Sequence, residues 1–181
     1  MYDRATLNLM KILGIDPGTA TTGYGSLNWD GNGIFSLHKF GWIETDKTLA
    51  ATVRLNSIYR QMMLLLTEMK PDAMIMEKVF FFSNAKTIIR VSQAQGVILL
   101  AADHCGIPVH ELTPSEVKKI VTGNGRAKKP EMQTVIKRIL KFKTPDKKKT
   151  HFDDVADALA VALSYIKKSQ LGVHEGVIVS G

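Results

Sequence analysis

Alternating and clustered apolar positions along the first third of the chain predict three strands and a long helix. The strand pattern occurs three times, in residues 11–17, 24–29 and 34–43. The links between these segments are short and rich in turn-forming residues, as in the Asp-Gly-Asn-Gly run at 30–33, so the strands should be antiparallel neighbours. Residues 49–69 carry apolar side chains at close to helical spacing, and Pro71 ends that helix.

The rest of the chain alternates short apolar runs with helical periodicity. Residues 72–77 and 108–112 are predicted strands, the first parallel to the N-terminal strand because a helical crossover separates them. Helices are predicted at 85–104, after the N-cap Thr113, at 130–141, and from near Asp153 to 168. The expected fold is α/β, with one mixed five-stranded sheet, three antiparallel strands first and then parallel ones, flanked by helices. It should occupy residues 11–168, after an extension at 1–10 and before a weakly ordered tail at 169–181.

Composition favours one domain in a reducing compartment. The chain has 181 residues, 45% of them hydrophobic, which is enough for one full core and too short for two substantial domains. Its single cysteine, Cys105, excludes an intramolecular disulfide framework and a cysteine-based zinc cluster, which fits the cytoplasm. No apolar run approaches the roughly 20 residues that span a bilayer, so no membrane association is expected.

Positive charge is concentrated between residues 118 and 149. The chain carries +7 overall, whereas this segment has twelve Lys or Arg residues against two acids, Glu131 and Asp146, so the remainder is slightly acidic. A basic segment on such a body predicts a polyanionic partner, with nucleic acid favoured over membrane because the segment lacks a broad aromatic face. A solvated lysine-rich surface is the alternative.

Four carboxylates are candidates for one site, and of these Asp157 is not explained by capping because it lies in the second turn of the last helix. Asp16 and Glu77 each end an apolar strand, and Asp154 and Asp157 share one face of the last helix because they are three residues apart. An Asx-type turn at Pro17 is the alternative explanation for Asp16. Such acids, without a matching set of His or Cys, are hard oxygen ligands that suit Mg²⁺ or Mn²⁺. Two such ions about 4 Å apart promote phosphodiester cleavage, so the pattern points to polynucleotide hydrolysis.

Two neighbouring residues receive a simpler interpretation. Asp153 is expected to cap the last helix, where an acid also favours the macrodipole. His151 is a lone histidine for which a cap or surface role is preferred, with proton transfer or metal contact as the alternative.

Five stretches of the chain carry a family resemblance. These are GIDPGTATTGYG, MEKVFFFSNAKT, QAQGVILLAA, SEVKKIVTGNGRAKK and DDVADALAVAL. In order and spacing, over roughly residues 11–168, they resemble the RuvC family of Holliday-junction resolvases, which has a ribonuclease H-like fold. The resemblance implies a homodimeric, Mg²⁺-dependent endonuclease, and the carboxylate ligands themselves suit two ions per site, with Mn²⁺ as a possible substitute. It also implies paired nicks across a four-way DNA junction in recombination and repair, and a RuvAB-type branch-migration complex as partner.

The resemblance also implies roles for individual residues. Asp16 matches the family's first-strand aspartate, Glu77 its glutamate, and Asp154 and Asp157 its paired acids on the last helix, which makes these four the expected catalytic and metal-binding residues. Some members have histidine at the position of Asp154, so Asp157 is the firmer assignment.

Further residues match positions that contact DNA. Phe80 corresponds to an aromatic that stacks on unpaired bases, and Lys118 and Lys129 to lysines that contact phosphate. Lys128 would replace Lys129 after a shift of one residue, and Arg126 lies in the same basic loop.

The resemblance places the dimer contact on the helix at 85–104. Lys78 departs from the neutral polar residue expected after the glutamate, and would either lower the pKa of Glu77 or touch phosphate.

Two other classes of function remain open on the sequence. GIDPGT also resembles a phosphate loop of actin-like kinases, although the chain has room for one lobe only. A catalytically silent junction-binding module is the second, which the retained carboxylates oppose because a protein that binds polyanions gains nothing from them without metal.

Overall fold

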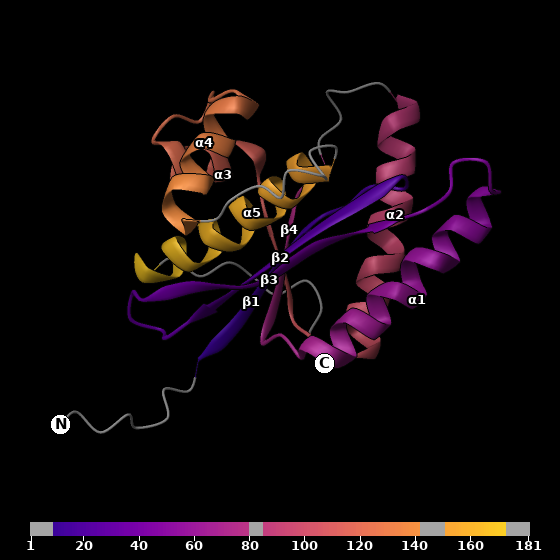
Figure 1. Ribbon diagram of the computed structural model, residues 1–181, viewed down its shortest axis with the longest axis horizontal. Helices are drawn as coiled ribbons and strands as arrows, with labels where there is room; N and C mark the ends of the chain where they lie inside the picture. The colour runs from indigo at the N-terminus through magenta and orange to yellow at the C-terminus, as the bar shows by residue number, and fades with distance from the viewer. Residues whose placement is uncertain (1–8, 80–84, 142–150, 173–181) are drawn as a thin grey trace.

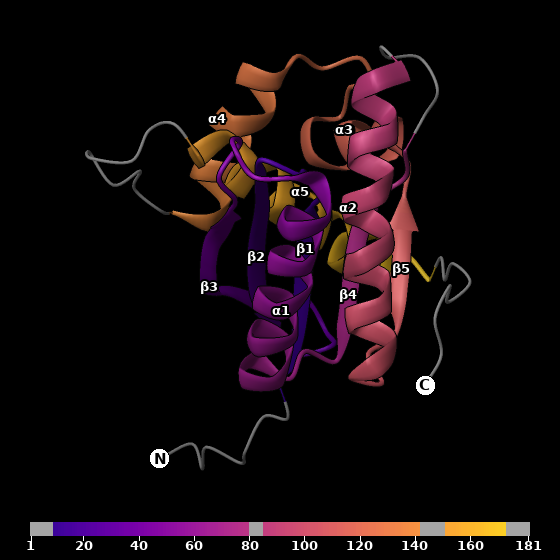
Figure 2. The same ribbon diagram turned by 90° about the vertical axis from the view of Figure 1, so that its right-hand side faces the viewer.

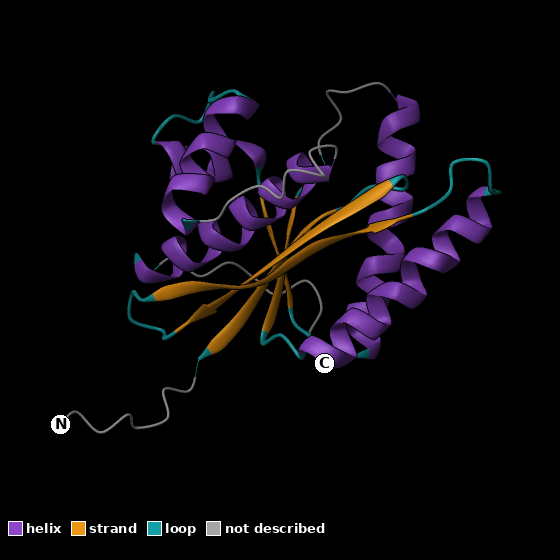
Figure 3. Ribbon diagram, viewed as in Figure 1, coloured by secondary structure: helices purple, strands orange, loops and turns teal. Residues whose placement is uncertain are grey.

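A computed structural model describes residues 9–79, 85–141 and 151–172, and it contains one five-stranded sheet. The strands are β1 (Met10–Asp16), β2 (Thr21–Trp29), β3 (Phe35–Glu44), β4 (Ala73–Glu77) and β5 (Val109–Leu112), in the spatial order β3-β2-β1-β4-β5. The first three are antiparallel neighbours, whereas β4 is parallel to β1 and to β5. The predicted mixed α/β architecture is therefore confirmed (Figure 3).

Five helices cover the two faces of the sheet in the described part of the chain. They are α1 (Ala51–Met69), α2 (Ala85–His104), α3 (Pro114–Thr122), α4 (Lys129–Leu140) and α5 (Phe152–Gln170). Helices α1 and α2 lie against one face, and α5 lies against the other with α3 and α4 outside it (Figures 1 and 2). None of these helices is long and apolar enough to cross a membrane.

Several element boundaries differ from the sequence prediction. Strand β2 begins at Thr21 rather than at residue 24, because Asp16 pairs with Gly23 and Thr21 with Glu44 across the sheet. Strand β1 includes Met10, and helix α1 begins two residues later than predicted. Helix α5 runs from Phe152 to Gln170, so residues 169 and 170 are helical.

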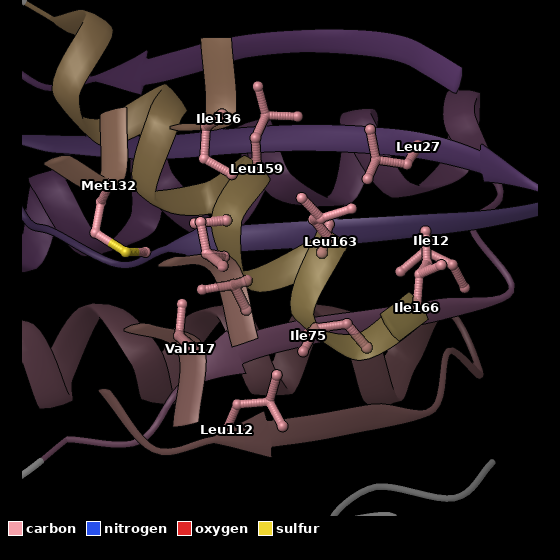
Figure 4. Packing of buried hydrophobic residues seen from close by; sticks show 14 of the residues in the cluster. Ile12, Leu27, Ile75, Leu112, Val117, Met132, Ile136, Leu159, Leu163 and Ile166 are labelled. Carbon is pink, nitrogen blue, oxygen red and sulfur yellow. The ribbon is translucent and has the colours of Figure 1, made fainter. Parts of the chain in front are cut away.

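Side-chain alternation divides the core between the two faces. On β1, Ile12 packs in the cluster beneath α5, whereas Leu13 and Ile15 pack beneath α1 and α2. Figure 4 shows Ile12 together with Leu163 of α5. Because alternate residues of a strand face the same way, the last residue of β1 points toward α5.

Helix α5 lies close to the sheet because glycines face it. A Cβ atom at Gly14 would meet the carbonyl oxygen of Ala158, and one at Gly25 would meet the side chain of Leu159. Gly23 stands below the first turn of α5, where a Cβ atom would lie 2.9 Å from Cβ of Asp154 and closer still to the carbonyl oxygen. These glycines let the helix backbone settle onto β1 and β2.

Candidate active site

Two carboxylates meet where the central parallel strands end. The β1–β4 register pairs Gly14 with Ile75 and Ile15 with Met76, so one further step sets Asp16 beside Glu77. Ile75 belongs to the core under α5, and alternation therefore turns Glu77 toward the same helix as Asp16. Both acids therefore lie at the same end of the central strands and on the same face of the sheet.

Helix α5 supplies the other two carboxylates. Asp154 lies in its first turn and Asp157 one turn later, on the side that packs over β1 and β2. Gly23 pairs with Asp16 on the neighbouring strand and leaves the space that the backbone of Asp154 occupies. All four predicted catalytic carboxylates are thus brought together.

The electrostatics of these acids show that they share one space. Burial, followed by the charges of Asp157 and Asp154, raises the pKa of Asp16 to about 8. Burial and then the charge of Asp157 raise the pKa of Glu77 to about 7. The pKa values of Asp154 and Asp157 are also raised, mainly by burial. Four acids that resist ionising together form a site that a cation would stabilise.

Two lysines flank the carboxylates. Nζ of Lys129, at the start of α4, lies 2.8 Å from Oδ2 of Asp157, and its charge opposes the raised pKa of each of the four acids. Lys118 comes from α3 and lowers the pKa of Glu77 by its charge. Both lysines line a cleft of about 210 Å³ together with Glu77 and Asp157. The cleft offers cations and carboxylates to the same ligand, as a phosphodiester with bound metal requires.

The donor set fits a hard divalent cation. In the part of the chain that the structure describes, no three His, Cys, Asp or Glu side chains are grouped tightly enough to hold a metal ion as they stand. Lys129 instead provides the positive charge beside Asp157. Carboxylate oxygens are the ligands that Mg²⁺ and Mn²⁺ prefer, and the mutual repulsion of these four acids is what such an ion relieves.

The two lysines at the start of α4 lie differently. Lys129 pairs with Asp157, while Lys128 is exposed at the N-cap position of α4. Arg126 is also exposed, and its backbone N–H donates to the side chain of Asn124. Phe80 lies outside the described residues. Lys129 lines the cleft, whereas Lys128 and Arg126 do not, and contact of these residues with phosphate stays a prediction.

Two interpretations of neighbouring residues change. Asp153 does not cap α5, because His151 occupies the N-cap position and Asp153 accepts a hydrogen bond from Gln133 at 2.6 Å. The charge of Lys78 lowers the pKa of Glu111 of β5, and it is not among the causes of the shifted pKa of Glu77.

The turn after Asp16 is not of the Asx type that the sequence left open. The hydroxyl of Thr22 donates to the carbonyl oxygen of Gly18 at 2.8 Å, and the N–H of Gly18 points back to this hydroxyl. The carboxylate of Asp16 is therefore not needed to close the turn.

Sequence reasoning missed the surroundings of His151. Its ring lies 5.1 Å from the ring of Trp42, its Nδ1 is 3.4 Å from the hydroxyl of Thr21, and its Nε2 is 3.6 Å from Glu44. These contacts join the N-terminus of α5 to the ends of β2 and β3. The role of Gly23 was also missed, although a glycine within a strand signals close approach of another backbone.

Comparison with known proteins agrees with this geometry. The family model described as crossover junction endodeoxyribonuclease RuvC matches residues 12–165. The RuvC protein of Syntrophomonas wolfei is 44% identical over 162 residues, which are 90% of this chain and 91% of that protein. The Dictyoglomus turgidum protein is 46% identical over 161 residues, covering 89% and 99%.

A solved structure supports the same assignment. The structure of Thermus thermophilus RuvC in complex with Holliday junction substrate superposes with a TM-score of 0.79 at 29% identity, covering 90% of this chain and 96% of that one. With the family model spanning most of the chain and relatives above 40% identity over nearly their full length, this chain belongs to the RuvC family of crossover junction endodeoxyribonucleases.

Proposed function

We propose that this protein resolves four-way DNA junctions by paired phosphodiester cuts, as a homodimer that holds two divalent ions in each active site. Nucleases of the RuvC family depend on divalent metal ions. The observation that carries the proposal is the convergence of four carboxylates and two lysines at the end of β1 and β4. Mg²⁺ is the proposed ion and Mn²⁺ a substitute, because all four protein donors are carboxylates.

Each side chain has a distinct part in this scheme. The charges of the other three acids all raise the pKa of Asp16, so Asp16 would help to hold both ions. Glu77 and Asp157 would each help to hold one ion, and Asp154 would complete the donor set or orient a water. Bound ions supply an activated water and charge stabilisation of the leaving 3′ oxygen. Lys118 lines the same cleft and would hold a phosphate beside the scissile bond.

Lys129 links substrate binding to the charge of the site. It pairs with Asp157 at 2.8 Å, so a divalent ion bound by Asp157 would compete with it. A lysine released from this pair carries its charge to the DNA phosphate in the same cleft. Lys128 and Arg126 would extend the phosphate contacts, and Phe80 would stack on bases at the junction centre.

Helix α2 is the proposed dimer contact. Ile89 and Leu100 are exposed large apolar residues on it, with exposed fractions of 58% and 46%. Gly96 lies between them, and a Cβ atom there would meet nothing within 4 Å. An apolar stripe with a gap in it suits the packing of a second helix. A two-fold dimer would set two sites on opposed strands of a symmetric junction, which makes the cuts paired.

The test is cleavage of a labelled synthetic four-way junction against a linear duplex of the same sequence, in Mg²⁺ and in EDTA. Paired nicks in the junction alone, absent in EDTA, are expected. The Asp16→Asn/Asp157→Asn double variant should bind the junction and cut it at least a thousandfold more slowly, an order of magnitude typical of lost electrostatic catalysis. Asp72→Asn is the matched control, because the side chain of Asp72 accepts a hydrogen bond from the backbone N–H of Lys11 and its charge is not among those that shift the pKa values of the four acids.

Other results would overturn parts of the proposal. Binding of the junction without cleavage in any divalent ion would indicate a silent binding module, and the absence of any preference for the junction would return attention to phosphotransfer. Cleavage by the double variant at the wild-type rate would refute the site. We place the reaction in the cytoplasm, with a RuvAB-type complex as partner, and co-purification of such a complex on junction DNA is the corresponding test.

A further inference from the structure

A second cleft lies near the same end of the strands as the carboxylates, but on the opposite face of the sheet. It has a volume of about 230 Å³ and lies between the starts of α1 and α2. Its lining is Thr19, Lys47, Leu49, Ala51, Arg54, Leu55, Arg90 and Gln93. These residues include three cations and no carboxylate, so the cleft is suited to an anion.

Two of the three cations are available to a ligand. Lys47 and Arg90 are exposed, and within the described residues neither has a carboxylate at ion-pair distance. Their charges meet in the cleft although they come from separate parts of the chain, the loop before α1 and the first turns of α2. The nearest acid in sequence, Asp46, accepts hydrogen bonds from the backbone and hydroxyl of Thr48.

The third cation is fixed in place. Arg54 donates from Nε to the hydroxyl of Thr45 at 2.9 Å and from Nη2 to the carbonyl oxygen of Thr19 at 2.7 Å. Ala51 begins α1, whose N-terminus has no side-chain cap, so the positive end of the helix dipole adds to these charges. The cleft therefore contains one cation held by hydrogen bonds, Arg54, and two exposed cations, Lys47 and Arg90.

The cleft adjoins the turn that follows Asp16, because Thr19 of this turn lines it. Thr19 lies three residues beyond Asp16, and the guanidinium of Arg54 holds it. Strand β3 ends at Glu44, which pairs with Thr21, so the loop leading to Lys47 leaves the same sheet edge. The catalytic cleft is lined mainly by residues of α3, α4 and α5, and this second cleft mainly by residues of α1, α2 and the loop before α1. Helices α5 and α1/α2 cover opposite faces of the sheet (Figure 2).

We propose that this cleft binds a backbone phosphate of the junction DNA outside the scissile position, where the substrate passes over the sheet edge. This inference rests on the proposed function and adds a binding site to it. A water molecule occupies about 30 Å³ in the liquid, so a space several times larger admits a phosphodiester group. Leu49 and Leu55 would pack against the adjoining sugar, and the cations read no base sequence.

The first experiment compares junction affinity as a function of salt concentration for wild type and the Lys47→Gln/Arg90→Gln double variant. Each lost phosphate contact reduces the slope of log K against log salt by about 0.9. The proposed homodimer carries the cleft twice, with one phosphate in each, so the double variant should lose about 2 in slope and bind roughly 10- to 100-fold more weakly at 0.1 M salt. The matched control is Arg60→Gln/Lys70→Gln. It removes one cation within α1 and one directly after it, and neither residue lines this cleft. This control should leave the salt slope and the junction affinity unchanged.

The second experiment identifies what the cleft holds. Single phosphates of the junction are replaced in turn by neutral methylphosphonates, and binding is measured with wild type and with the double variant. Replacement of the phosphate at one or two positions should weaken binding to wild type. The same replacement should have no further effect on the double variant, because that contact is already absent.

Three results would overturn the inference. They are an unchanged salt slope in the double variant, an equal loss in the control, and the absence of any phosphate whose effect depends on Lys47 and Arg90. In the last case the cleft would be a site for a small free anion. Failure of the proposed function is distinguishable, because wild type would then show no preference for the junction in the first place.

Discussion

Substitution of Gly23 by alanine tests whether the close approach of α5 to the sheet positions the active site. The added Cβ atom would lie 2.9 Å from Cβ of Asp154, whereas ordinary van der Waals contact begins near 3.4 Å, and it would meet the carbonyl oxygen at a shorter distance still. The obstacle is mostly helix backbone, which cannot rotate away as a side chain does. The first turn of α5 must therefore move by at least about half an ångström, and Asp154 moves with it.

The expected effect on cleavage is large relative to the effect on folding. A displacement of about 1 Å in a catalytic group costs on the order of 100-fold in rate, so Gly23→Ala should slow junction cleavage by roughly 10- to 100-fold. Overpacking of this kind costs about 1–3 kcal/mol of unfolding free energy. Junction affinity should change by less than about threefold, because the lysines proposed to contact phosphate lie on α3 and α4.

The assay is single-turnover cleavage of a labelled junction, with urea unfolding to measure the free energy of unfolding of each variant. Gly25→Ala is the matched control, because it adds the same methyl group to the same strand but meets chiefly the side chain of Leu159, which can shift. It should lose comparable stability and retain most of its activity. If Gly23→Ala cuts within threefold of wild type while fully folded, positioning of Asp154 by this glycine is refuted.

Three further predictions concern charge. Lys129→Met should move the pH–rate profile to higher pH, since its charge lowers the pKa of Asp16 and the other acids, whereas Lys128→Met should not move it; equal shifts would contradict the assignment. Without divalent ions, Asp16→Asn should raise the melting temperature at pH 9 and have little effect at pH 4. Burial and the neighbouring acids raise the pKa of Asp16 from 3.8 to about 8 in the folded protein. Wild-type stability therefore falls as pH rises between these values, by several kcal/mol at about 1.4 kcal/mol per pKa unit. Mg²⁺ should reverse this loss for wild type only, as thermal unfolding would show. Glu116→Ala should cost about 1 kcal/mol at pH 7, because the carboxylate completes the capping box of α3 and pairs with Lys168. The pKa of Glu116 is lowered to about 2, so this difference should shrink as the pH of the urea titration falls from about 4.5 toward 2.

Local signals in the sequence anticipate much of the fold. Helix α1 ends just before Pro71 and helix α2 ends at His104, both as predicted, and Thr113 caps α3 with Pro114 in the first turn. These features depend on the chemistry of a few adjacent residues, which acts whatever the rest of the chain does. Boundaries were less certain where pairing decides them, as at Thr21, which is in a strand because Glu44 lies opposite.

The sequence by itself determined that Asp16 and Glu77 end strands and that Asp154 and Asp157 share a helix face, since the periods of strand and helix are local properties. Only the tertiary structure decided that the four acids meet. That depends on the parallel register of β1 with β4 and on glycines that admit α5, contacts between residues far apart in the chain. It also decided that Lys129 rather than Lys128 faces Asp157, because a shift of one residue turns a side chain through about 100° around a helix. Spacing in sequence fixes a direction on one element, whereas packing of several elements fixes what lies in that direction.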